Sequence, residues 1–98
     1  MPPMDIAARF GQNLRRCRRQ AGLSQEDLSV RASLHRTEIS HLERGLRIPR
    51  IDTLVKLRGS LDISADELLI GMGWSPGGTR IGEFSSEDSK PDALGVEA

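Results

Sequence analysis

The sequence is poor in residue types on which several classes of small protein depend. Its 98 residues include one cysteine, no tyrosine and 3% aromatic residues. A single cysteine excludes a disulfide framework, and no apolar run approaches the roughly 18 residues of a membrane span. The first residues also lack the apolar block of a signal peptide. We therefore expect a cytoplasmic protein without membrane association, whose core is modest and aliphatic.

Residues for catalysis or metal binding are equally scarce. His35 and His41 are six positions apart, which on a helix separates them by about 120°. Cys17 falls within an apolar stripe. Neither a glycine-rich phosphate loop nor a metal-ligand spacing is present. We expect no enzymatic activity, no catalytic residue, no metal and no cofactor.

The formal net charge of zero conceals a strong polarity along the chain. Residues 1–58 contain 12 basic and 6 acidic residues, whereas residues 59–98 contain 2 basic and 8 acidic ones. A basic region of this kind is typical of nucleic-acid binding. The first part of the chain is therefore the candidate for a nucleic-acid contact, and an acidic part follows it.

Two short helices are predicted within residues 23–45. Ser24 and Asp27 have the spacing of a capping box, so a helix should begin here and run to about Arg31. The apolar pattern breaks at residues 32–34 and then resumes, until Gly45 ends a second helix in a left-handed conformation. Two helices joined by so tight a turn form a helix-turn-helix. The second helix should bury Ile39 and Leu42 and present a polar face made of Arg36, Thr37, Ser40, His41 and Arg44.

Three further helices complete the expected bundle. Residues 6–21 form a helix capped by Asp5, whose stripe buries Ile6, Phe10, Leu14 and Cys17. Its other faces carry Arg9, Arg15, Arg16, Arg18 and Arg19, which form either a DNA-facing cationic surface or an ordinary solvated face. A fourth helix over residues 51–60 should bury Ile51, Leu54, Val55 and Leu57, with Arg50 as a poor N-cap. A capping box from Ser64 to Glu67 should open a short fifth helix that ends at Gly71.

The two ends of the chain differ from this middle part. Residues 1–5 should fray, and residues 72–98 form a tail rich in glycine, serine and acidic residues, mostly disordered from residue 75. Residues 79–84 alternate weakly, but one isolated strand is not stable by itself. Trp74 has two interpretations, as a packing residue at the start of the tail or as a dimer anchor.

The motifs GLSQEDL, EISHLERG, P-x-x-DTL and DISADELL resemble, in order and spacing, the DNA-binding domain of lambdoid phage repressors, Cro proteins and regulators of the xenobiotic-response-element type. The resemblance covers residues 9–71. It implies an all-α, five-helix lambda-repressor-like bundle over residues 6–71, in which the second and third helices contact DNA.

The resemblance also implies roles for single residues. Base edges would be contacted by Arg36, Thr37, Ser40 and His41. Phosphates would be bound by Gln25, Arg44, Arg47 and Arg50, while Arg18 and Glu43 would form a structural ion pair between helices. Several positions depart from the family pattern. Ser33 replaces a turn glycine, which predicts backbone strain. His35 replaces a hydroxyl N-cap, which weakens the helix end or lets the imidazole approach a phosphate.

The expected function is that of a sequence-specific transcriptional regulator. It would act as a repressor and bind double-stranded DNA as a homodimer on a pseudo-palindromic operator. The alternative is an antitoxin-type or other interaction module that binds a partner protein through residues 72–98.

Overall fold

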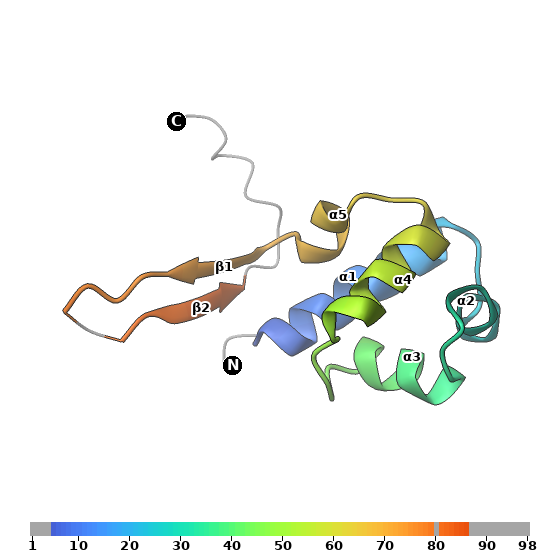
Figure 1. The fold of residues 1–98 in the computed structure, drawn as a ribbon, viewed down its shortest axis with the longest axis horizontal. Coiled ribbons are helices and arrows are strands. Elements are labelled where there is room, and N and C mark those ends of the chain that lie inside the picture. The colour runs from blue at the N-terminus through green and yellow to red at the C-terminus, as the bar shows by residue number, and fades with distance from the viewer. Residues whose placement is uncertain (1–4, 80, 87–98) are drawn as a thin grey trace.

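The structure is a computed structural model that describes residues 5–79 and 81–86. Within these residues the chain forms five helices and then an antiparallel hairpin (Figure 1). The helices are α1 (Ile6–Gln20), α2 (Gln25–Ala32), α3 (Arg36–Glu43), α4 (Ile51–Leu61) and α5 (Ala65–Leu69). The strands are β1 (Met72–Ser75) and β2 (Glu83–Ser86). The predicted helical bundle is confirmed.

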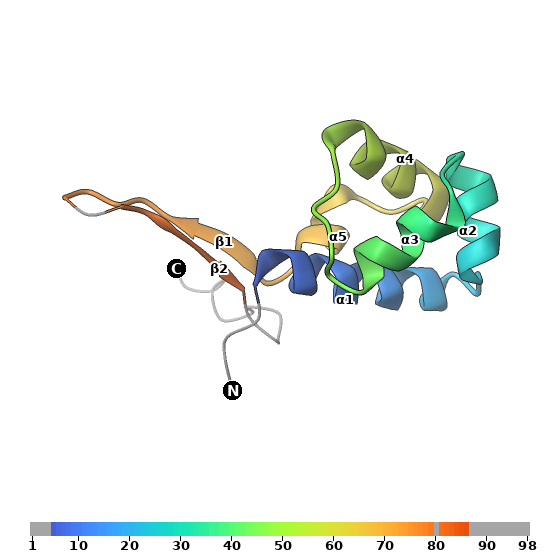
Figure 2. The same ribbon diagram turned by 90° about the horizontal axis from the view of Figure 1, so that it is seen from below.

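A single aliphatic core joins the five helices. In Figure 2, α1 runs along one side of the bundle and α4 lies on the opposite side, with α3 and α5 between them. The largest fully buried apolar side chains come from all five helices; they are Phe10, Leu14, Leu28, Ile39, Leu42, Leu57 and Leu68. Cys17 is buried among them, as its position on the apolar stripe predicts.

Helix α1 approaches α3 closely at Gly11. A Cβ atom at this position would lie 2.6 Å from the carbonyl oxygen of Glu43 and would also overlap that of Leu42. Only glycine therefore lets α1 pack directly against the last turn of α3.

Most of the predicted helix ends are present. The Asp5 carboxylate accepts a hydrogen bond from the Ala8 N–H at 2.8 Å, and Ser24 and Asp27 form the reciprocal capping box. The capping box expected at Ser64 is wrong, because its side chain makes no capping hydrogen bond. The short helix closes its first turn through the backbone instead, where the Ser64 carbonyl accepts from the Glu67 N–H.

The predicted buried face of α4 is also wrong in part. Ile51 and Val55 are 74% and 59% exposed, whereas Leu57 and Leu61 are buried. The buried row passes through Thr53, Leu57 and Leu61 at spacings of four residues. Because threonine is not a strong apolar signal, the sequence pattern favoured the neighbouring row.

The residues after α5 form a hairpin rather than a disordered segment. β1 pairs with β2 in the register Met72↔Ser86 and Trp74↔Phe84, so the expected disorder from residue 75 and the all-α description are wrong for these strands. The physical reason is that Glu83–Ser86 has a partner strand, which its weak alternation does not reveal. Figures 1 and 2 show the hairpin projecting away from the bundle. The predictions for residues 1–4 and 87–98 lie outside the described residues.

Trp74 packs on the hairpin and not on the helical core. Its ring contacts that of Phe84 edge-to-face, with centroids 4.9 Å apart. The indole remains 55% exposed.

Candidate nucleic-acid interface

A single left-handed residue makes the turn between α2 and α3. Ser33 has φ 54° and ψ 46°, and its N–H donates to backbone oxygens of the preceding turn. This is the strained position that the missing glycine predicts. α3 then begins at Arg36 without a capping hydrogen bond from the exposed side chain of His35. The weak cap is confirmed.

The two faces of α3 differ as the sequence predicts. Ile39 and Leu42 are buried and fix the helix to the core. On the outer side, exposed or half-buried side chains form a row: Arg36, Thr37, Ser40, His41 and Arg44. Among the residues that the structure describes, none of these five side chains has a hydrogen-bond or ion-pair partner. Their donors and acceptors are therefore available to a ligand.

A basic segment follows α3. Arg47 and Arg50 are both exposed, and Arg50 pairs with Asp52 at 3.2 Å on the surface. Arg50 makes no capping hydrogen bond at the start of α4, as expected for this residue type. The Asp52 carboxylate instead accepts from the Thr53 N–H.

Behind the outer row, one carboxylate holds three helices together. Glu43, the last residue of α3, accepts hydrogen bonds from Arg18 of α1 through two nitrogens, one of them at 2.9 Å. Gln25 Nε2 of α2 donates to the same carboxylate at 3.0 Å, and Arg15 Nε does so at 3.4 Å. Arg18 also donates to the Leu23 carbonyl oxygen at 2.9 Å. The predicted ion pair of Arg18 and Glu43 is present, and it is the centre of a larger cluster.

The cluster keeps Glu43 ionised although its side chain is fully buried. Burial by itself would raise the pKa of Glu43, but the hydrogen bonds from Arg18, Gln25 and Arg15 outweigh it and lower the pKa below its ordinary value. The hydrogen bond to Glu43 raises the pKa of Arg18, although desolvation by itself would lower it. The orientation of α3 is thus fixed by the hydrogen bonds that Arg18, Gln25 and Arg15 donate to the Glu43 carboxylate.

The arginines of α1 are divided between the packing of the bundle and its surface, where Arg15, Arg16 and Arg19 lie together. Arg9 and Arg18 are buried. Arg16 donates to Asn13 Oδ1 at 3.0 Å and to the Glu67 carbonyl oxygen at 3.0 Å, and Arg15 contacts Glu43. Of these five arginines, all of which are described, Arg19 is exposed and the Arg15 side chain is 43% exposed. Part of the charge of α1 therefore serves the packing of the bundle, and the cationic surface that the sequence allows stays a prediction for Arg15, Arg16 and Arg19.

The sequence pattern missed the role of Asn13. This residue is fully buried, and its Nδ2 donates at 2.9 Å to the carbonyl oxygens of Leu68 and Ile70. It satisfies backbone groups at the end of α5, where the helix leaves acceptors without partners. The available signal was a polar residue inside the apolar stripe of α1, between Phe10 and Cys17.

Metal-binding groups and membrane-spanning helices are both absent from the described residues. These residues contain no group of three or more His, Cys, Asp or Glu side chains that could hold a metal ion. They also contain no helix whose length and hydropathy would suffice to cross a bilayer.

Known proteins resemble this chain in the same region. The sequence profile of the helix-turn-helix family matches residues 14–68. The uncharacterized HTH-type transcriptional regulator y4dJ of Sinorhizobium fredii is 39% identical over 77 residues, which make up 79% of this chain and 100% of that protein.

Solved structures agree with the sequence comparison. The restriction-modification controller protein C.AhdI from Aeromonas hydrophila has 40% identity and a TM-score of 0.62, and the match covers 63% of this chain and 94% of that one. SinR, a master regulator for biofilm formation solved in complex with DNA, has 33% identity and a TM-score of 0.59, with 61% and 97% covered. The chain therefore belongs to the helix-turn-helix family, together with transcriptional regulators and restriction-modification controller proteins.

Proposed function

We propose that this protein is a transcriptional regulator, acting as a repressor, which binds double-stranded DNA and reads an operator sequence with α3 in the major groove. The observation that carries the proposal is the row of unpartnered side chains on the outer face of α3. The major groove of B-DNA accepts one α-helix and presents a distinct donor and acceptor pattern for each base pair. A rigid helix with free donors on one face matches that geometry. The regulators in its family are not enzymes in general, and we assign it no catalytic step.

The first four side chains of the row have different capacities for base recognition. Arg36 can donate two hydrogen bonds to the O6 and N7 atoms of a guanine. Thr37, Ser40 and His41 offer single donors and acceptors, and the threonine methyl group can contact that of thymine. We assign base contacts to these four residues.

Phosphate contacts would come from Arg44, the last residue of the row, and from residues around the row. Arg44, Arg47 and Arg50 are exposed cations at the end of α3 and in the segment after it, and His35 lies before the first turn of α3. Gln25 donates to Glu43 through Nε2, and an amide nitrogen carries two hydrogens, so one remains for a phosphate oxygen. Such contacts set the position of the protein on the duplex without selecting a sequence.

One α3 helix contacts too few base pairs to select a site in a genome, so we propose a homodimer on a pseudo-palindrome. The two half-sites would be centred about 34–36 Å apart, one turn of the duplex. Selection of bound sequences from a random DNA pool tests site, symmetry and spacing together. A single unpaired half-site with a monomeric mass on DNA would contradict the dimer.

DNA binding itself is tested by retention of bulk DNA on a filter at low salt. Binding should weaken steeply as salt rises, because cations are released from the phosphates. Arg44→Ala should weaken retention, whereas Arg58→Ala, which removes an exposed arginine from α4, serves as the matched control. Failure of the wild-type protein to retain DNA at low salt would refute the proposed function.

A further inference from the structure

An apolar cavity opens at the end of the bundle from which the hairpin projects. Its volume is about 150 Å³, and apolar residues from four elements and the segment before α4 line it, among them Ala7, Ile48, Leu54, Leu69 and Met72. All of its lining side chains are apolar. A cavity of about 150 Å³ with a lining of this kind accepts a benzene ring. The cavity therefore has the size and chemistry to accept one aromatic side chain.

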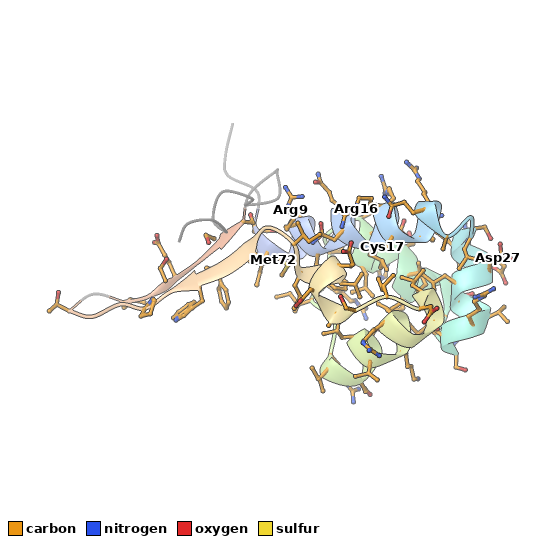
Figure 3. All side chains as sticks on the ribbon, turned by 90° about the horizontal axis from the view of Figure 1, so that it is seen from above. Arg9, Arg16, Cys17, Asp27 and Met72 are labelled. Carbon is orange, nitrogen blue, oxygen red and sulfur yellow. The ribbon has the colours of Figure 1, made fainter. Side chains whose placement is uncertain are left out.

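The hairpin presents aromatic rings on the face that continues from this cavity. Met72 lies at the junction of hairpin and bundle (Figure 3) and lines the cavity. Trp74 is two residues further along β1, so its side chain points to the same face. Phe84 is its cross-strand partner, and the two rings are 55% and 63% exposed. We call Trp74 and Phe84 the aromatic pair.

The aromatic pair of one copy cannot fill the cavity of that same copy. A strand rises about 3.3 Å per residue, so Trp74 lies about 7 Å further from the bundle than Met72. Figures 1 and 2 show that the hairpin continues away from the helices. One continuous surface thus holds both an exposed aromatic group and a cavity that fits one, which is the self-complementarity that a two-fold dimer requires.

The exposed apolar area agrees with a contact between copies. Ile48 and Leu69, which line the cavity, are 64% and 39% exposed, and Ile51 and Val55 of α4 are 74% and 59% exposed. Together with the aromatic pair they offer on the order of 600 Å² per copy. A standard interface buries about 800 Å² per partner, part of it polar. A symmetric contact between two copies would cover this surface.

We infer that a second copy of this chain covers this surface, with one ring of the aromatic pair of each copy inserted into the cavity of the other and the second ring packed against its rim. The inference rests on the homodimer of the proposed function and names its interface. In such a dimer each hairpin extends as an arm onto the other copy, and an aromatic ring from one chain fills the cavity of the other.

The tryptophan fluorescence of the full chain tests the position of the interface, because Trp74 is its one tryptophan. The emission maximum should shift to shorter wavelength as the protein concentration rises, over the range in which sedimentation velocity shows dimer formation. A protein that stays monomeric, or one that dimerises without a change in Trp74 emission, would overturn the inference.

Mixing two variants tests the exchange. Trp74→Ser with Phe84→Ser removes the aromatic pair, and Ala7→Phe fills the cavity; each should weaken self-association by about 30-fold or more, as expected when a hot-spot residue is truncated or blocked. An equimolar mixture should recover association, because the heterodimer retains one intact aromatic pair facing one open cavity. Val30→Ser, at an exposed position of α2, should leave association unchanged.

The outcomes separate this inference from the proposed function. Unaltered dimerisation of the double serine variant, or no recovery in the mixture, would place the interface elsewhere. A monomeric double serine variant should still retain bulk DNA at low salt but lose its preference for a palindromic site. A wild-type dimer that showed the expected Trp74 shift and failed to bind DNA would refute the proposed function and leave the interface standing.

Discussion

Glu43 is a buried carboxylate that joins α1, α2 and α3. Replacing it with alanine leaves the Arg18 guanidinium, which is 10% exposed, without a counter-charge. Removing one partner of a buried ion pair costs about 3–5 kcal/mol, so Glu43→Ala should lower the free energy of unfolding by about that amount. Chemical denaturation measures the change. Glu26→Ala, at an exposed position of α2, is the control, and an equal effect of both substitutions would reduce the pair to a surface contact.

The same carboxylate predicts how stability depends on pH. The donors around Glu43 lower its pKa in the folded state, so the unfolded state binds the proton more readily. The stabilisation is present above the ordinary glutamate pKa of about 4.3 and is lost as pH falls through the folded value. The free energy of unfolding, measured in urea between about pH 3 and pH 6, should fall less steeply in Glu43→Gln. Asp27, whose pKa is lowered by its hydrogen bonds to Ser24, is unchanged in that variant and keeps its own contribution to the slope.

Arg36 and Arg47 are both exposed arginines, but the proposed roles give them different signatures. Arg36→Ala should cost about 1–3 kcal/mol on the best site and relax the preference at one base position per half-site. Arg47→Ala should weaken binding to all DNA sequences by a similar factor. It should also reduce the slope of log affinity against log salt concentration by about 1 for each phosphate that the complex no longer neutralises. Titrations of each variant against the best site and a scrambled duplex, at several salt concentrations, distinguish the two. Equal losses of affinity on both duplexes for Arg36→Ala would make it a phosphate-binding residue.

At the scale of elements, the sequence predicted features that depend on neighbouring residues better than features that depend on contacts between distant parts of the chain. The turn at Ser33 and the box of Ser24 with Asp27 depend on neighbouring residues, and both are present. Which row of α4 is buried depends on the helices that pack against it, and these select the row through Thr53. The hairpin depends on the pairing of two strands, in which Trp74 lies opposite Phe84, ten residues later in the sequence. Within the site, the ion pair came from the family resemblance, whereas the Gln25 and Arg15 contacts with Glu43 arise only when three helices meet.

The turn between α2 and α3 can be made more stable by relieving Ser33. A left-handed conformation costs a non-glycine residue about 1–2 kcal/mol, and glycine gives back about 0.4–1 kcal/mol through the greater freedom of the unfolded chain. Ser33→Gly should therefore stabilise the protein by roughly 0.5–1 kcal/mol in thermal or urea unfolding. The same exchange at Ser60, inside α4, should destabilise by roughly 0.5 kcal/mol. If Ser33→Gly and Ser60→Gly changed the free energy of unfolding in the same direction, the turn at Ser33 would not be strained.

At the scale of the whole molecule, the two halves of the chain carry opposite charge. Residues 87–98 contain four acidic residues and one lysine, and we expect a chain segment with this charge to compete with phosphate for the basic residues around α3. Deleting residues 87–98 should therefore tighten binding to non-specific DNA at low salt, and the difference should fade at high salt. A full-length variant with Glu87, Asp88, Asp92 and Glu97 replaced by their amides separates charge from length. If the amide variant binds like the wild type, the charge of this segment does not act on the DNA-binding face.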